Sequence, residues 1–400
     1  MSYQINLETK LSIKVENCNF KTITISFLNI LNVLFQDYVS QVLIYYFNTY
    51  YESGKLAEIL LVHSVRKKTT AVKTKFKTLF GDIFVPQIQV LVLDFDGIEK
   101  QMSITRKLLG VETKFQIPDF MKDLMGWIGS VSTYRVGHNI IGALTNFKCS
   151  LMSVWNSVQY YAKKIQLNLH EKGTNEYEAD GTGIPTYKSG KRGSELKKVF
   201  QRKEDGKLHL VGIGIGKYKS LSNWITVLSA SIKEGIIKFG KIVLSCDGDN
   251  SIINAAKFIN KKVKFQKDLW HVFHQLKYYL WQDGVGKEMK NKIIGHFYKI
   301  TMLSKGSKKR RAKRIKRYLT LLFSLNYKHS VVYLKSMLKY FYTFEIESNT
   351  NIYTSKTERS MRTTNQRINV GVWSDEGALN ATKVRLAYYY NGISPLNWKK

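Results

Sequence analysis

Two aspartates, each followed directly by glycine, carry the clearest chemical signal in the sequence. Asp180 stands in "EADG" and Asp247 in "SCDG", and each ends a predicted run of strand-forming residues. Ligands of mixed sheets tend to bind outside the carboxyl ends of strands, so neighbouring strands would bring these carboxylates together. Carboxylates that close need a proton or a cation between them, which predicts a divalent metal site. Because Asp-Gly is also a strong turn dipeptide, a pair of ordinary turns is the alternative.

A late predicted helix offers a third carboxylate. "TERSMRTTNQR" carries Glu358 with Arg362, Asn365 and Arg367, and a second helix capped by Ser374 follows it. A glutamate surrounded by Arg, Thr and Asn is a candidate third metal ligand, although a lone glutamate is more often a surface ion-pair partner. Glu345, Glu347 and Glu376 are its competitors in this part of the chain.

Alternating strands and helices must position these residues. Short strands are predicted at 177–180, 197–201 and 207–216, then a helix from 221, a continuous apolar strand at 242–246 and a helix from 251. This order indicates a mixed sheet with helices on its faces, and the apolar strand suits its buried centre. Beyond Val272 the apolar spacing is helical, which predicts three or four further helices.

The glycines of "VGIGIGKY" do not form a phosphate-binding loop. A dinucleotide fingerprint needs its third glycine two residues later, and a P-loop needs Ser or Thr where Tyr218 stands. We expect these glycines to allow close backbone packing instead.

Charge points to a polyanionic partner. Lys and Arg number 63 against 30 Asp and Glu, a formal net charge of +33. Residues 1–150 hold 17 basic and 12 acidic side chains, a net +5, which leaves +28 for the rest of the chain. The segment Lys305–Arg317 has nine basic residues in thirteen, so we expect it to contact phosphates. Nucleic acid is the first candidate partner, and a membrane surface or an unspecific basic surface is the alternative.

Cysteine usage and hydropathy favour the cytoplasm. The three cysteines, Cys18, Cys149 and Cys246, have no paired spacing, so neither a disulfide framework nor a cysteine zinc site is supported. The most apolar stretch, 22–35, is shorter than the ~20 residues that span a bilayer, and no signal peptide is recognisable. We expect no membrane association.

The first ~110 residues show no recognisable chemistry. About 110 residues read as a long helix followed by strands. Residues 125–165 then predict two helices separated near 145–148, a spacing that suits a helix-turn-helix with its second helix in a DNA groove. An ordinary core helix pair is the alternative.

The order of these motifs resembles a known family. "ADGTG", "SCDGDN", "DLWH", a long helical stretch, "TERSMRTTNQR" and "WSDEGAL" are similar to the DDE transposases of insertion sequences, above all the Mutator-like group and its bacterial and archaeal relatives. The likeness covers residues 174–395. In that group a ribonuclease-H-like domain carries Asp, Asp and Glu, with an all-helical insertion before the Glu. The Cys-or-Asp, two residues, His signature of the group is matched by Asp268 and His271.

The resemblance implies an α/β fold, a ribonuclease-H-like mixed sheet with an all-helical insertion, preceded by a mostly helical DNA-binding region. The domains expected are 1–115, an α+β region of unknown role; 116–172, helix-turn-helix-like; 173–271 with 346–400, catalytic; and 272–345, the insertion. Glu358 is preferred as third ligand because it shares its predicted helix with the Arg and Asn residues that follow the family's glutamate.

The resemblance further implies a transposase that nicks and joins DNA. Asp180, Asp247 and Glu358 would be catalytic and would bind two Mg²⁺ or Mn²⁺ ions, which suit carboxylate oxygens. Asp268 and His271 would orient the site or touch the DNA end, and a zinc site with His274 is the alternative. Expected DNA contacts are Lys188, Lys191, Arg192, His271, Lys308, Lys309, Arg310, Arg311, Arg314, Arg362 and Arg367.

The expected partners are the double-stranded terminal inverted repeats of the element and its target DNA. The protein would act in the prokaryotic cytoplasm, associated with the nucleoid, as a homo-oligomer, a dimer on DNA. Other functions compatible with the residues are a non-catalytic DNA-binding remnant of a transposase and a structure-specific nuclease of the same fold.

Three finer expectations concern the surroundings of these residues. Gly181 and Gly183 would let the backbone turn beneath the metal, and the segment Lys188–Lys198 would form a phosphate-binding edge. Trp270 is expected in the core, because large aromatic side chains are usually buried, and stacking on a flipped base is the alternative.

Overall fold

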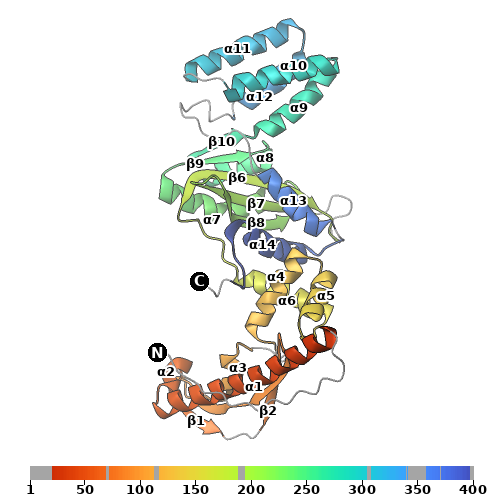
Figure 1. Ribbon diagram of the computed structural model, residues 1–400. Helices are drawn as coiled ribbons and strands as arrows, with labels where there is room; N and C mark the ends of the chain where they lie inside the picture. The colour runs from red at the N-terminus through yellow and green to blue at the C-terminus, as the bar shows by residue number, and fades with distance from the viewer. Residues whose placement is uncertain are drawn as a thin grey trace. The chain divides into compact units, whose positions relative to one another are not determined.

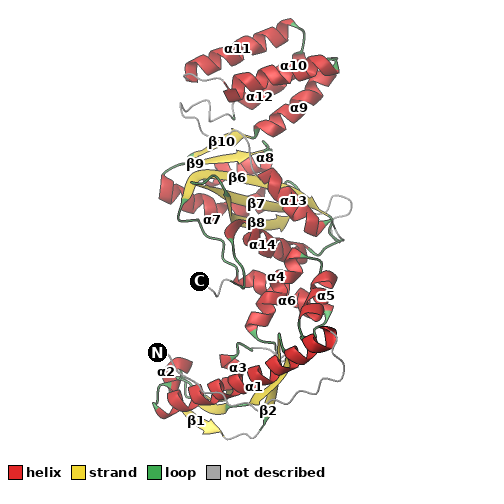
Figure 2. Ribbon diagram, in the orientation of Figure 1, coloured by secondary structure: helices red, strands yellow, loops and turns green. Residues whose placement is uncertain are grey.

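The computed structural model describes residues 20–68, 72–111, 117–187, 194–303, 308–338, 340, 357–369 and 371–396. The chain divides into two compact units, Met1–Lys164 with Ser394–Lys400, and Ile165–Ile393. Both units contain helices and strands (Figure 1, Figure 2), so the expected mixed α/β character is confirmed.

The first unit begins with a long helix that packs on small antiparallel sheets. Its elements are α1 (Phe20–Glu52), α2 (Leu56–Leu60), β1 (Ser64–Lys68), β2 (Lys73–Thr78), β3 (Gly81–Pro86), β4 (Gln89–Leu93), β5 (Glu99–Ser103) and α3 (Ile104–Leu108). One sheet has the order β1-β4-β5, and β2 and β3 form a separate hairpin. Val39 and Leu43 of α1 pack against Phe76, Ile83 and Val85 of that hairpin.

Helix α1 is longer and more apolar than the sequence suggested. Its segment Ser26–Glu52 has the length and composition of a membrane-spanning helix. The expectation that the apolar stretch is too short to span a bilayer was therefore wrong as an argument from length. The core helices of soluble proteins and signal sequences share this length and composition.

Three helices follow in the first unit where two were expected. They are α4 (Asp119–Val131), α5 (Tyr134–Leu144) and α6 (Leu151–Lys164). The break at 145–150 agrees with the prediction. The additional break arises because the Thr133 side chain accepts a hydrogen bond from the amide of Val136 and so starts a new helix. Gly126 lets α4 approach α6 closely, because a Cβ there would lie 2.6 Å from the Ser157 carbonyl oxygen.

A five-stranded mixed sheet forms the centre of the second unit. Its elements are β6 (Gly173–Ile184), β7 (Ser194–Lys203), β8 (Leu208–Gly216), α7 (Leu221–Phe239), β9 (Ile242–Cys246), α8 (Asn250–Ile259) and β10 (Val263–Lys267). The strand order is β10-β9-β6-β7-β8. Strands β6, β7 and β8 are antiparallel to one another, whereas β9 runs parallel to both β6 and β10.

Helices cover both faces of this sheet. Trp224, Leu228 and Ile232 of α7, with residues of α8, pack on one face. On the other face, Leu386 of α14 (Asp375–Asn391) packs on Phe200 of β7, and α13 (Thr357–Ile368) lies against β6. All five residues of β9 are buried, as expected for a central strand.

The glycines of "VGIGIG" serve packing, as expected. They lie in β8, and a Cβ at Gly214 would collide with Val227 of α7. The absence of side chains at these positions brings α7 close to the sheet.

A helical subdomain with its own core follows β10. It consists of α9 (Leu269–Gln282), α10 (Lys287–Tyr298), a π-helical turn (Lys299–Leu303), α11 (Lys308–Ser324) and α12 (Lys328–Leu338), which Figure 1 shows grouped beyond the β10 edge of the sheet. Leu276, Phe297, Ile315 and Leu334 belong to its core. The prediction of three or four helices after the sheet is confirmed in the described part of the chain.

Candidate catalytic site

Asp180 lies on β6, and Asp247 directly follows its parallel neighbour β9. The pairing of β6 with β9 sets Glu176 opposite Val243 and Glu178 opposite Ser245, and the same register continued by two residues sets Asp180 opposite Asp247. Parallel neighbours lie about 4.8 Å apart, so the two side chains start from adjacent backbone positions. The structure thus brings together two carboxylates that are 67 residues apart in the sequence (247 − 180).

Both aspartates project to the same face of the sheet. Tyr177 and Ala179 of β6 and Leu244 and Cys246 of β9 enter the core beneath α7 and α8. Because successive side chains of a strand alternate between faces, Asp180 and Asp247 project to the opposite face, which α13 partly covers.

The expected strand end at Asp180 was wrong. Strand β6 continues to Ile184 because β7 pairs with it along the whole length, with Gly181 opposite Lys197 and Gly183 opposite Glu195. Asp180 instead lies just beyond the part of β6 that pairs with β9. Asp247 does follow its strand directly, as predicted.

The expected glycine turn beneath Asp180 was also wrong. Gly181 and Gly183 are extended residues within β6. A Cβ at Gly181 would collide with the carboxylate of Glu195, whereas Gly183 has open space around it. The need for glycine at position 181 therefore comes from cross-strand packing.

Asp180 has a buried cationic partner that sequence reasoning missed. Lys198, its cross-strand neighbour on β7, has no exposed side-chain surface, and its Nζ lies 3.2 Å from Asp180 Oδ2. The same Nζ donates a hydrogen bond to Thr182 Oγ1 at 2.8 Å and one to Ser360 Oγ of α13 at 3.3 Å. Lys198 thereby links the first aspartate to the helix that carries Glu358.

The basic segment 188–198 is not a continuous phosphate-binding edge. Residues 188–193 lie outside the described part of the chain. Lys197 and Lys198 are fully buried in β7, and Lys197 pairs with Glu195 at 2.6 Å. The expectation was wrong for these two lysines, because helices cover both faces of the strand and each cation has a carboxylate nearby, Glu195 of the same strand for Lys197 and Asp180 of β6 for Lys198.

Asp247 lies in a strongly polar environment. Its Oδ1 accepts a hydrogen bond of 2.8 Å from the amide of Asp249, whose own side chain caps α8. Burial raises the pKa of Asp247, and the charges of Asp249 and Asp180 add to that rise, whereas His271 opposes it. The carboxylates of Asp247 and Asp180 therefore repel each other in this structure.

The Asp268–His271 motif starts α9 beside Asp247. Asp268 is the N-cap of that helix and accepts a hydrogen bond from the amide of Trp270. His271 lies 3.8 Å from the Asp268 carboxylate, and its charge favours the ionised form of Asp247. The core expectation for Trp270 was wrong: 48% of the side chain is exposed, and its ring stacks on His274.

Glu358 belongs to α13 by its backbone, and its side chain is not among those described. The helix contacts β6 one turn further on, where Met361 Sδ accepts a hydrogen bond from Thr182 Oγ1 at 2.7 Å. Arg385 of α14 holds α13 from behind through the Thr363 carbonyl oxygen. Helix α13 is thus fixed against the face of the sheet that carries Asp180.

Asp180 and Asp247 have the donor chemistry of a Mg²⁺ or Mn²⁺ site, since both ions prefer carboxylate oxygens. Asp180 Oδ2 is buried and accepts no hydrogen bond, although Lys198 lies near. Among the side chains that the structure describes, no group of three or more His, Cys, Asp or Glu residues is arranged to hold a metal. The pair fits part of an ion-binding site and needs at least one further ligand.

The expected DNA-contacting residues fall into three groups. Lys188, Lys191 and Arg192 lie outside the described residues, and Lys308, Lys309 and Arg311 are described only by their backbone in α11. Arg310, Arg314 and Arg362 are exposed, and His271 is half-buried. Arg367 is 2% exposed, and its guanidinium group lies 4.5 Å from the centre of the Trp373 ring, so it faces the protein.

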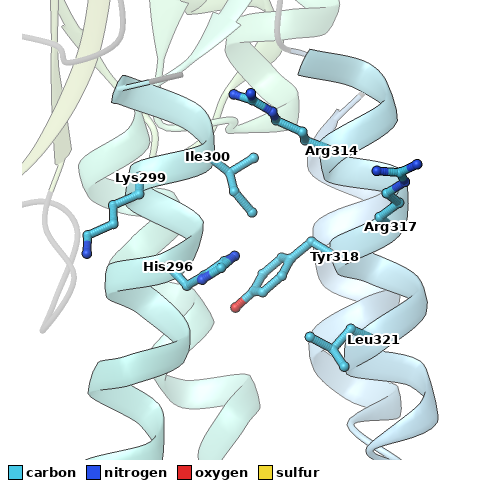
Figure 3. Close-up of a pocket in the computed structure, with 7 residues that line it drawn as sticks. All are labelled: His296, Lys299, Ile300, Arg314, Arg317, Tyr318 and Leu321. Atoms are coloured by element: carbon cyan, nitrogen blue, oxygen red, sulfur yellow. The ribbon is translucent and has the colours of Figure 1, made fainter. Parts of the chain in front are cut away.

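Arg314 borders a cationic groove in the helical subdomain (Figure 3). The groove has a volume of about 610 Å³ and is lined by His296, Lys299, Ile300, Arg314, Arg317, Tyr318 and Leu321, none of them acidic. Tyr318 points across it toward His296, on whose ring it stacks. Such a surface attracts phosphate groups.

Neither protein-family models nor curated protein sequences match the chain.

Proposed function

We propose that this protein is a DDE transposase whose second unit is a ribonuclease-H-like catalytic domain. The observation that carries the proposal is the placement of Asp180 on β6 and of Asp247 directly after the parallel strand β9, where their charges interact, with the helix that contains Glu358 packed on β6. Carboxylates that repel one another are retained where a cation compensates them, and DNA binding alone gives no reason for them.

The order of the elements supports the same proposal. Three antiparallel strands are extended by parallel strands that carry the second aspartate, and helices α9–α12 separate that aspartate from the helix of Glu358. This is the arrangement that the resemblance to the Mutator-like group implies. The helical subdomain also bears the exposed cations Arg310, Arg314 and Arg317 for DNA phosphates.

The chain's own residues have definable tasks in this chemistry. Asp180, Asp247 and Glu358 would hold two Mg²⁺ or Mn²⁺ ions, which activate the attacking oxygen and stabilise the leaving oxygen of an in-line displacement at phosphorus. Lys198 positions Asp180, and Asp268 positions His271 at the edge of the site. Water would attack in the nicking step, and the freed 3′-hydroxyl would attack in strand transfer.

The test is a nicking and joining assay with Mg²⁺ on DNA that carries the sequences flanking the gene. Asp180→Asn, Asp247→Asn and Glu358→Gln keep side-chain size and are expected to bind DNA but to lose nicking and joining together. Asp205→Asn, in the exposed turn between β7 and β8, is the matched control and is expected to keep both activities. Normal nicking by Asp180→Asn and Asp247→Asn would refute the assignment.

A non-catalytic DNA-binding protein is the second candidate. The observation that favours it is the buried Lys198, because an ammonium group 3.2 Å from Asp180 compensates that carboxylate without any metal. This candidate predicts that the wild-type chain binds DNA in Mg²⁺ and neither nicks nor joins it.

A further inference from the structure

A cavity of about 570 Å³ opens beside Asp247. It lies between the loop that follows β9 and the helices α9 and α12, and its volume is in the range of small-ligand sites. It is lined by Lys219, Asp247, Gly248, Asp249, Lys267, Gln275, Tyr279, Lys328, His329, Val332, Tyr333, Ser336 and Met337. No residue of this set besides Asp247 has a role in the proposed chemistry.

A buried lysine faces this cavity. Lys267, the last residue of β10, is 4% exposed, and its Nζ lies 5.8 Å from the centre of the Tyr333 ring. Within the described residues it makes no ion pair shorter than 4 Å and no side-chain hydrogen bond. Burial lowers its pKa, although Asp247 opposes that change. An ammonium group in this position needs an anion close by.

Gly248 keeps the space around that ammonium group open. A Cβ at this position would lie 2.6 Å from Lys267 Nζ, and the backbone φ of +89° disfavours any other residue. The glycine after Asp247 thus serves the cavity as well as the turn.

Two aromatic rings also line the cavity, the half-buried Tyr279 and the buried Tyr333, which is 6% exposed. Tyr279 of α9 and Tyr333 of α12 stack with their ring centres 4.5 Å apart and their planes 23° apart. The Tyr333 hydroxyl donates a hydrogen bond to Gln275 Oε1, which fixes the ring, and Val332 and Met337 add apolar surface. Flat aromatic surfaces of this kind stack on nucleobases, at ~1 to 3 kcal/mol per base.

The charges that line the cavity leave an excess of cations. The Asp249 carboxylate caps the N-terminus of α8 and forms an ion pair with Lys219, whose Nζ lies 3.5 Å away. Asp247 is then the one carboxylate of the lining left for both Lys267 and the exposed Lys328. The cavity therefore combines a phosphate-binding floor with a base-binding wall.

We propose that this cavity binds one unpaired nucleotide of the DNA strand, with its phosphate on Lys267 and its base against Tyr279, whose ring the buried Tyr333 supports. That the nucleotide belongs to a DNA strand follows from the proposed function, on which this proposal rests. It adds that the protein holds a nucleotide outside the duplex next to Asp247, and that the helical subdomain supplies the base-binding wall.

Photo-crosslinking tests the proposal without any catalysis. The probe is a duplex with a short unpaired tail of 5-iododeoxyuridine, irradiated with the full-length protein in EDTA, and the labelled tyrosines are mapped by mass spectrometry. Labelling of Tyr279 or Tyr333 is expected. Lys267→Met should lower it about tenfold or more, since a hydrogen bond to a charged group is lost. Lys264→Met, an exposed lysine on the same strand, should leave the labelling unchanged.

A second variant guards against misfolding of Lys267→Met. Ser336→Trp fills the cavity from α12 and leaves Lys267 intact, so it should abolish the labelling in a protein whose circular dichroism spectrum and melting temperature match the wild type. Labelling confined to other residues, such as those of α11, overturns the proposal. Equal labelling by free 5-iododeoxyuridine monophosphate at the same concentration also overturns it, because the site then takes a free nucleotide.

The outcomes separate the cavity from the catalytic assignment. Crosslinking without nicking in Mg²⁺ would support the cavity and count against the transposase. Nicking by the wild type without labelling of either tyrosine would do the reverse.

Discussion

Replacing Lys198 by methionine separates the two roles open to Asp180. The lysine is fully buried, and its Nζ contacts Asp180, Thr182 and Ser360. Methionine has a similar length but neither charge nor hydrogen-bond donors. Without the lysine, the Asp180 carboxylate loses the one cationic partner that it has among the described side chains.

The expected cost in metal-free buffer is large. Removing one partner of a buried ion pair costs about 3 to 5 kcal/mol. The Asp180 side chain is 16% exposed, so water compensates part of the loss and the lower end of that range, about 3 kcal/mol, applies. For a unit of this size that corresponds to a fall of roughly 6 to 12 °C in melting temperature.

Magnesium should reverse much of this loss. In the wild type the ammonium group of Lys198 opposes a metal ion at Asp180, and in the variant that opposition is gone. An ion present at ~100 times its dissociation constant stabilises the folded state by ~2.7 kcal/mol. We therefore expect Mg²⁺ to raise the melting temperature of Lys198→Met by several degrees more than that of the wild type.

The assay is thermal unfolding followed by circular dichroism in EDTA and in Mg²⁺. Lys203→Met, on the same strand, is the control, because its exposed contact with Asp205 at 3.9 Å contributes little. Equal Mg²⁺ increments in Lys198→Met and the wild type would show that Asp180 binds no ion. No destabilisation in EDTA would show that the Lys198–Asp180 pair does not form.

Three further outcomes follow from the structure. Gly181→Ala should destabilise the second unit by ~1 to 3 kcal/mol, because the added Cβ collides with the buried Glu195 carboxylate. Gly183→Ala should leave the urea midpoint of the second unit almost unchanged, because nothing lies near a Cβ at that position. Burial and a neighbouring histidine lower the pKa of His209 to about 4. The wild type should therefore lose folding stability as the pH falls from ~6.5 toward 4, because the unfolded state takes up the proton first. Urea unfolding at pH ~6.5 and pH ~4 should show a smaller loss for His209→Gln. Replacing both Arg314 and Arg317 by Gln should reduce the slope of log K against log salt for duplex DNA by about 2 in anisotropy titrations, and an unchanged slope would exclude phosphate contacts in the groove.

Much of the second unit could be predicted from local sequence. The apolar run 242–246 indicated a buried central strand, and helical spacing indicated the helices after β10. The cap at Ser374 was also correct, because its side chain accepts a hydrogen bond from the Gly377 amide. These features depend on residues close in sequence, where periodicity and capping are informative.

The surroundings of Asp180 could not be predicted in this way. The letters "ELKKVFQRK" of β7 suggest an exposed basic strand, yet eight of the nine residues from Glu195 to Lys203 are buried. Their burial depends on carboxylates that the fold brings near them, such as Asp180, which the register sets opposite Lys198, and Glu178, which pairs with Arg202. Register is a long-range property, so charge composition alone assigned Lys197 and Lys198 to the surface.

Lys198 is also the reason why the two candidate functions remain experimentally separable. In a protein that only binds DNA, this lysine would be a permanent counter-ion for Asp180, and its bond to Ser360 would merely hold α13 in place. In a transposase, an arriving cation would compete with the ammonium group, and the contact with α13 would weaken at the moment when Glu358 is needed. Metal binding would then be coupled to the position of the third ligand. If metal binding at Asp180 is coupled to α13 through the Lys198–Ser360 contact, Ser360→Ala should alter the Mg²⁺ affinity of a transposase. DNA binding should stay unchanged by Ser360→Ala, whether the protein is a transposase or only binds DNA.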